Sequence, residues 1–114
     1  MFPEITVNEL SEKLSSDDSF ILLDVREPDE LDYAKLADPR LEVTPMSRLA
    51  QTGTKALSEA AQSKDAVIYV LCHHGNRSAQ VTAWLAQQGW QNVFNVSGGI
   101  DQYARQIDQS IGFY

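Results

Sequence analysis

Apolar residues in this chain gather in short continuous runs. Residues 20–25 read Phe-Ile-Leu-Leu-Asp-Val and residues 66–71 read Ala-Val-Ile-Tyr-Val-Leu, so both runs are almost unbroken. Such runs are typical of strands that are covered on both faces of a sheet. The two segments are therefore expected to be central parallel strands, and a third strand is expected at 93–96.

Segments with helical signals lie between these runs. Thr6 and Glu9 have the spacing of a reciprocal N-terminal cap and predict a first helix. The alanine-rich segment 54–62 predicts a crossover helix. From 78 to 88 apolar residues recur at helical spacing, and Gly89 stands where a left-handed residue often ends a helix.

The order strand, helix, strand, helix, strand predicts an α/β fold with an open, mostly parallel central sheet and helices on both faces. Gly98 and Gly99 break the third strand before a last short helix through Tyr103, whereas 106–114 has no clear pattern. Residues 37–45 contain two prolines and predict an irregular connection. At 114 residues, the chain is expected to form a single domain over 1–114.

Charge and cysteine content narrow the possible partners. The chain has 16 acidic and 9 basic residues, a net charge of -7, which argues against binding to nucleic acids or anionic membranes. Its single cysteine cannot form an internal disulfide, and the N-terminal residues lack the pattern of a signal peptide. No apolar run approaches the roughly 18 residues that span a bilayer. We expect a monomeric protein of the reducing cytoplasm.

Candidate chemistry lies where the second apolar run ends, at 72–78, Cys-His-His-Gly-Asn-Arg-Ser. A turn from a strand into a helix can direct backbone N–H groups at one point, and the helix N-terminus adds partial positive charge. That field favours the thiolate of Cys72, the nucleophilic form of cysteine. Gly75 permits a tight turn, Arg77 can neutralise an anion, and Ser78 can cap the helix or turn its hydroxyl inward.

The order cysteine, two residues, glycine, one residue, arginine, serine resembles the active-site loop of the rhodanese family. Residues 24–28, Asp-Val-Arg-Glu-Pro, are similar to a signature of that family, and residues 96–100, Val-Ser-Gly-Gly-Ile, are similar to its C-terminal double-glycine signature. The resemblance implies a rhodanese-like α/β fold, a cysteine persulfide intermediate, and donors such as thiosulfate or another persulfide.

Two departures from the family pattern are visible. After the first signature the family often has a histidine and then a proline-glycine turn, but residues 34–40 read Ala-Lys-Leu-Ala-Asp-Pro-Arg, with Lys35 at the histidine position. Tyr103 stands where tryptophan is common. The conformation of the 34–45 connection is therefore not predicted by the resemblance.

The rhodanese interpretation assigns a role to each candidate residue. Cys72 is the expected nucleophile and sulfur carrier, and Arg77 is its expected electrostatic partner. Asp24 and Arg26 are expected to support the loop through hydrogen bonds. A thiol, cyanide or a sulfur-carrier protein would accept the sulfur, and no cofactor is expected. The expected substrate-binding cradle consists of His73, His74, Gly75, Asn76, Arg77 and Ser78.

Several alternatives stay open at this point. Cys72 alone could be an inert buried residue, His73 and His74 could be metal ligands, and Arg77 could pair with Asp24. Cysteine-dependent phosphatases place five residues between cysteine and arginine, whereas four, 73–76, lie between them here. A non-catalytic binding module of the same fold is the remaining alternative, although such modules have lost the cysteine.

Overall fold

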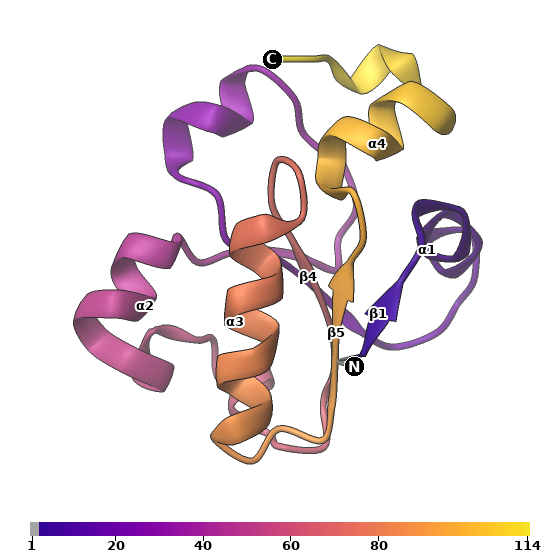
Figure 1. The fold of residues 1–114 in the computed structure, drawn as a ribbon. Helices are drawn as coiled ribbons and strands as arrows, with labels where there is room; N and C mark the ends of the chain where they lie inside the picture. Colours follow the sequence, from indigo (N-terminus) through magenta and orange to yellow (C-terminus); the bar gives the residue numbers. More distant parts are fainter. Residues whose placement is uncertain (1–2) are drawn as a thin grey trace.

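A five-stranded sheet forms the centre of the computed structural model, which describes residues 3–114. The strand order is β1-β5-β4-β2-β3, and every strand pair within the described residues is parallel, as the sequence predicted (Figure 1). The strands are β1 (Glu4–Ile5), β2 (Ile21–Asp24), β3 (Leu41–Val43), β4 (Val67–Leu71) and β5 (Asn92–Val96).

Two helices cover each face of this sheet, which confirms the predicted layers (Figure 1). In β2, Ile21 and Leu23 pack into the core cluster that contains side chains of α2 and α3, whereas Leu22 packs into the cluster that contains side chains of α1 and α4. All four β2 residues are buried, which explains why this strand is a continuous apolar run rather than an alternating one. The helices are α1 (Val7–Leu14), α2 (Met46–Thr52), α3 (Asn76–Gln87) and α4 (Gly99–Gln106).

Local signals at the helix ends act as expected. The amide of Glu9 donates to the Thr6 hydroxyl at 3.1 Å, and the amide of Thr6 donates to the Glu9 carboxylate at 3.0 Å, which completes the cap of α1. Gly89 follows α3 with a φ of +107°, the left-handed conformation that the sequence predicted. α3 begins at Asn76 rather than at Ser78, because Gly75 already acts as its N-cap.

The prediction of a crossover helix at 54–62 was wrong. The crossover helix is α2, and residues 53–62 hold only the two short 3-10 helices Gly53–Ala56 and Ala60–Gln62. Gly53 ends α2 with a φ of +70°. Leu57 is extended and buried in the core, so burial of this side chain interrupts the helix that the alanine content favours.

The connection between the first two predicted strands is more ordered than its sequence suggests. It contains β3, whose Leu41 lies opposite Leu22 of β2. β3 has only three residues, which are too few to show the alternation of a strand, so it was not predicted. β1, at two residues, was missed for the same reason.

All five strands point the same way, so their carboxyl ends meet at one edge of the sheet. The loop after β4 and the turn after β5 both leave from this edge, and α3 and α4 begin there (Figure 1). No helix within residues 3–114 is long and apolar enough to cross a membrane.

Candidate active site

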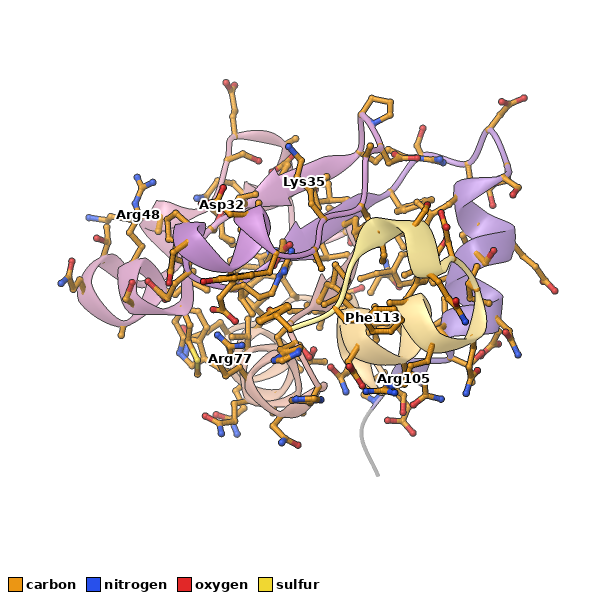
Figure 2. The ribbon with its side chains drawn as sticks, turned by 90° about the horizontal axis from the view of Figure 1, so that it is seen from above. Asp32, Lys35, Arg48, Arg77, Arg105 and Phe113 are labelled. Carbon is orange, nitrogen blue, oxygen red and sulfur yellow. The ribbon has the colours of Figure 1, made fainter. Side chains whose placement is uncertain are left out.

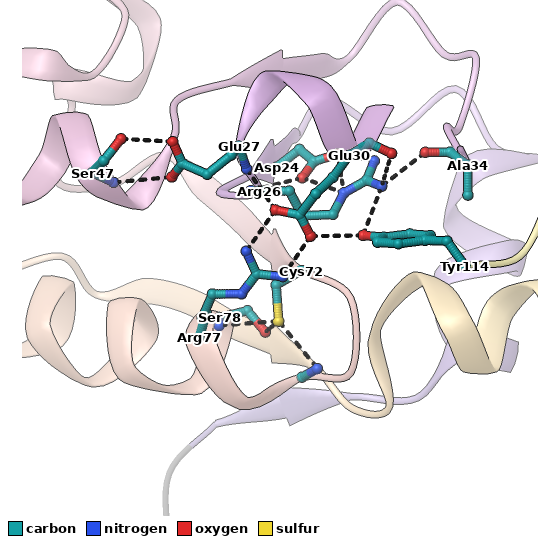
Figure 3. Close-up of polar contacts among 11 residues, drawn as sticks. Asp24, Arg26, Glu27, Glu30, Ala34, Ser47, Cys72, Arg77, Ser78 and Tyr114 are labelled. Atoms are coloured by element: carbon teal, nitrogen blue, oxygen red, sulfur yellow. Dashed lines mark hydrogen bonds and ion pairs between the residues drawn. The ribbon is translucent and has the colours of Figure 1, made fainter. Parts of the chain in front are cut away.

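Cys72 lies at the carboxyl end of β4, where the chain turns into α3, and only 1% of its surface is exposed. The amides of Gly75 and Ser78 both donate to its Sγ, at 3.1 and 3.3 Å (Figure 3). Gly75 has a φ of +98°, which favours glycine and allows the loop to close around the sulfur. Two backbone N–H groups and the N-terminus of α3 thus stabilise negative charge on this atom.

A buried polar pair lies beneath the sulfur. The Oγ of Ser78 is 3.3 Å from Sγ of Cys72 and donates a hydrogen bond to Oδ1 of Asn95 in β5. Both side chains are buried, Ser78 completely. Sequence reasoning placed Ser78 in the cradle but missed Asn95, whose only signal is a polar residue between the apolar Phe94 and Val96 of β5.

The N-terminus of α4 holds the other side of the loop. The amide of Ile100 donates to the carbonyl of Cys72 at 2.9 Å, and the amide of Asp101 donates to the carbonyl of His73 at 3.0 Å. Gly98 and Gly99 are therefore more than a turn into the last helix, because they bring the start of α4 against the backbone of the cysteine loop.

Arg77 forms a two-armed ion pair with Glu30, at 2.8 Å for each of its terminal nitrogens. These bonds lower the pKa of Glu30 from 4.5 to about 2. The pKa of Arg77 is raised, first by Glu30 and also by the nearby Cys72 sulfur. Glu30 lies in the 3-10 helix Pro28–Asp32 and was not among the residues that the sequence assigned to the site.

The suggested pairing of Arg77 with Asp24 was wrong, because Arg26 occupies that carboxylate. Arg26 donates to Asp24 through Nε at 2.9 Å and Nη2 at 2.7 Å, and both residues are fully buried. The remaining Nη1 donates to the carbonyl of Ala34 at 2.8 Å. Asp24 and Arg26 thus hold residues 28–34, including Glu30, beside the cysteine loop.

The C-terminal segment packs back onto the site. The hydroxyl of Tyr114 donates to Glu30 at 2.9 Å and accepts from Nη1 of Arg26 at 3.2 Å (Figure 3). Its ring stacks on His73, with ring centres 3.7 Å apart and planes 6° from parallel. Burial, followed by the neighbouring His74, lowers the pKa of His73. No periodicity in 106–114 indicated this contact.

The remaining cradle residues are more exposed. His74 and Asn76 lie at the surface, and Nδ1 of His74 is 3.9 Å from Oδ2 of Asp101. Candidate ligand atoms of His73, His74 and Asp101 lie within 4.8 Å of one another. However, the two imidazole rings are stacked with centres 3.9 Å apart, so their in-plane lone pairs run side by side rather than converging, and Asp101 already accepts from Arg105. We assign no metal to this cluster.

A cavity of about 560 Å³ lies between α1, residues 31–38 and the C-terminal segment. Leu14, Lys35, Tyr103 and Ile111 are among its lining residues, and none of residues 72–78 lines it. The chemistry of the cysteine loop is thus separate from this cavity.

The sequence of this chain is similar to those of several known proteins. The chain is 36% identical over 105 residues to a sulfurtransferase of Allochromatium vinosum, covering 92% of this chain and 91% of the relative. It is 38% identical to the rhodanese-like/PpiC domain-containing protein 12 (chloroplastic) of Arabidopsis thaliana, of which it spans only 37%. It is also 33% identical to a putative sulfur carrier protein of Bacillus subtilis, of which it spans 53%.

The fold has close counterparts among solved structures. A rhodanese-related protein of Thermoplasma volcanium superposes with a TM-score of 0.74 at 32% identity, covering 93% of this chain and 94% of that one. Residues 6–106 match the description of a rhodanese-like domain. The three signatures, the parallel sheet and these similarities lead to one conclusion: the chain belongs to the rhodanese-like family, in which it has sulfurtransferase relatives.

Proposed function

We propose that the protein is a sulfurtransferase that moves a sulfane sulfur from thiosulfate or another persulfide donor to a thiophilic acceptor through a persulfide on Cys72. The observation that carries this proposal is the pair of N–H groups, from Gly75 and Ser78, that point at the only cysteine sulfur of the chain. Such donors are already in place for a negatively charged sulfur and need no rearrangement when it forms.

The first half-reaction forms one sulfur–sulfur bond and breaks another. The Cys72 thiolate attacks the outer sulfur of thiosulfate, and the electron pair of the broken bond leaves with sulfite, so Cys–S⁻ and S₂O₃²⁻ become Cys–S–S⁻ and SO₃²⁻. With an organic persulfide donor the leaving group is a thiolate. In the second half-reaction a thiol, cyanide or a sulfur-carrier protein attacks the outer sulfur and regenerates Cys72.

The roles of the surrounding residues follow from their positions. The main-chain groups of the loop form the cradle, and Gly75 and Ser78 contribute the two amides nearest the sulfur. Ser78 also brings its hydroxyl, held by Asn95, to the same atom. Arg77 is the nearby cation, and Asp24 with Arg26 holds the segment that positions Glu30 against it. The exposed His74 and Asn76 contribute to the rim of the site.

The relatives support a protein or thiol acceptor. One of them is named a putative sulfur carrier protein. For this chain we propose a thiol or a sulfur-carrier protein as the acceptor, in a reducing compartment such as the cytoplasm, where Cys72 stays a thiol.

A cysteine-dependent phosphatase is less well supported by the same residues. Four residues rather than five separate Cys72 from Arg77, and both terminal nitrogens of Arg77 are bound to Glu30 instead of pointing at an anion in the loop. A non-catalytic module would need neither Cys72 nor amides directed at its sulfur.

Intact mass measurement after incubation with a donor tests the proposal. Wild type, incubated with thiosulfate or with glutathione persulfide, is expected to gain one sulfur atom, about 32 Da, which cyanide or a thiol removes. The matched control is Cys72→Ser, which keeps the size of the side chain and is expected to gain nothing. Failure of reduced, folded wild type to gain sulfur from either donor would overturn the proposal, and a panel of phosphate esters would then test the phosphatase alternative.

A further inference from the structure

We propose that Glu30 is a specificity-determining residue that makes the site discriminate against doubly charged thiosulfate and favour organic persulfides. The inference rests on the proposed sulfur transfer through Cys72. It concerns which class of donor loads that cysteine, and it gives a function to the ion pair between Glu30 and Arg77.

The first argument is the position of the ion pair. Cys72 is 1% exposed, so a donor reaches its sulfur only by entering among the side chains that cover it. In Figure 3 the guanidinium of Arg77 lies between the Glu30 carboxylate and the Cys72 sulfur, and the sulfur is near enough to raise the pKa of Arg77. A donor on this side of the sulfur therefore meets Arg77 together with Glu30.

The second argument is that Arg77 is already neutralised. Its two terminal nitrogens each donate to a different oxygen of Glu30 at 2.8 Å. Tyr114 donates to one of these oxygens and the amide of Glu27 donates to the other, at 2.9 and 2.8 Å. Four hydrogen bonds thus hold the carboxylate in place, and an incoming anion has to compete with it for Arg77.

The other arginines around the site are paired as well. Arg26 is bound by Asp24, and Arg105 at α4 donates to Asp101 at 2.9 Å. Figure 2, which views the molecule from the carboxyl ends of the strands, shows Arg77 and Arg105 on α3 and α4 at this end. His73 offers little compensation, because burial disfavours its charged form. A dianion entering here finds arginines that each already hold a carboxylate.

The charge of the donor then determines how strongly Glu30 opposes its approach to Cys72. Thiosulfate carries two negative charges, which are shared between the outer sulfur under attack and the oxygens of the group that leaves as sulfite. An organic persulfide has at most one charge at its sulfur atoms, and its leaving group is a thiolate attached to carbon. The Glu30 carboxylate, held in place on Arg77, opposes the first donor more than the second, since Coulomb repulsion scales with the product of the charges.

Glu30→Gln is the variant that tests this, because it removes the charge and keeps an oxygen that can accept from the amide of Glu27. The rate constants for loading Cys72 are measured by quenched-flow and intact mass with thiosulfate and with glutathione persulfide. The ratio of the two rate constants, thiosulfate over persulfide, is expected to rise about tenfold in Glu30→Gln. The matched control is Asp29→Asn, an exposed carboxylate of the same turn, which is expected to change the ratio less than twofold.

A second variant ties the effect to Arg77. Adding Arg77→Gln to Glu30→Gln is expected to return the ratio to near the wild-type value, because the gain requires a freed guanidinium. An unchanged ratio in folded Glu30→Gln, or an equal rise in Asp29→Asn, overturns the specificity role while leaving sulfur transfer intact. No loading of wild type by either donor overturns the proposed function itself. If circular dichroism shows that Glu30→Gln is unfolded, Glu30→Ala is measured against the same criterion, and an unchanged ratio in it counts equally against the proposal.

Discussion

Gly99 lies directly against the carbonyl of His73: a Cβ placed at position 99 would be 2.5 Å from that oxygen. The contact joins the start of α4 to the loop that carries Cys72. It gives the double glycine a packing function that no other residue type can perform, because any side chain at position 99 would force two backbones apart.

Gly99→Ala is therefore expected to destabilise the protein by about 3 kcal/mol, from the clash and from the φ of +64°. It should also slow sulfur loading, since the loop has to shift. The control is Gly53→Ala, where φ is +70° but nothing lies within 4 Å of the added Cβ. Urea unfolding and the rates of sulfur loading are measured for both variants. Equal losses of stability and rate in the two would contradict the role of the contact with His73, because backbone strain alone would then account for the effect.

The buried Asp24–Arg26 pair gives a second prediction. Arg26→Gln leaves the Asp24 carboxylate buried without its cation, so unfolding free energy is expected to fall by about 3–5 kcal/mol. Arg40→Gln is the comparison, because Arg40 forms a bidentate ion pair with Asp38, also two residues away, but its side chain is 19% exposed. Its loss is expected to be about 1–2 kcal/mol. A smaller loss in Arg26→Gln than in Arg40→Gln would show that burial does not set the strength of these pairs.

Features encoded by neighbouring residues were predictable from the sequence. The cap of α1 needs only Thr6 and Glu9, three positions apart, and the loop at 72–78 carries its glycine, arginine and serine in one segment. Burial of β2 and β4 on both faces left continuous apolar runs. In these cases the local pattern and the tertiary structure favour the same conformation, which is why the central strands of the sheet were predicted and the cysteine loop was singled out.

Features that depend on distant residues were not predictable in the same way. Glu30 lies 47 positions from Arg77 and 84 from Tyr114, and no local spacing relates them. Asn95 reads as one polar residue in a strand until Ser78 is placed beside it. At 54–62 the local preference for helix is overridden by the buried, extended Leu57. Only the folded chain brings these side chains together.

Tyr114 and His73 supply a third prediction, which concerns proton binding. Burial is the main cause of the lowered pKa of His73, and the Tyr114 ring covers one face of the imidazole. Tyr114→Ala is expected to raise the pKa of His73 towards 6.5, its ordinary value. Tyr114→Phe keeps the stacked ring and loses only the hydroxyl bonds to Glu30 and Arg26, so the pKa of His73 is expected to stay lowered. Titration of the histidine ring signals by NMR measures both variants, and an identical pKa in Ala and Phe variants would show that the ring does not shield His73.

The Glu30–Arg77 pair predicts how stability changes in acid. The pKa of Glu30 falls from 4.5 to about 2 on folding, so the folded protein holds this proton less tightly than the unfolded chain does. The resulting stabilisation is fully present above pH 4.5 and is lost as the pH falls from there through about 2. Because Arg77 is one-third exposed and solvent screens the pair, the contribution is expected to be about 1–2 kcal/mol, less than the full shift implies. Between pH 5 and pH 2 the unfolding free energy of Glu30→Gln should therefore decline by about 1–2 kcal/mol less than that of the wild type. The control Asp29→Asn is expected to follow the wild type. Parallel curves for all three proteins would mean that the pair contributes no net stability.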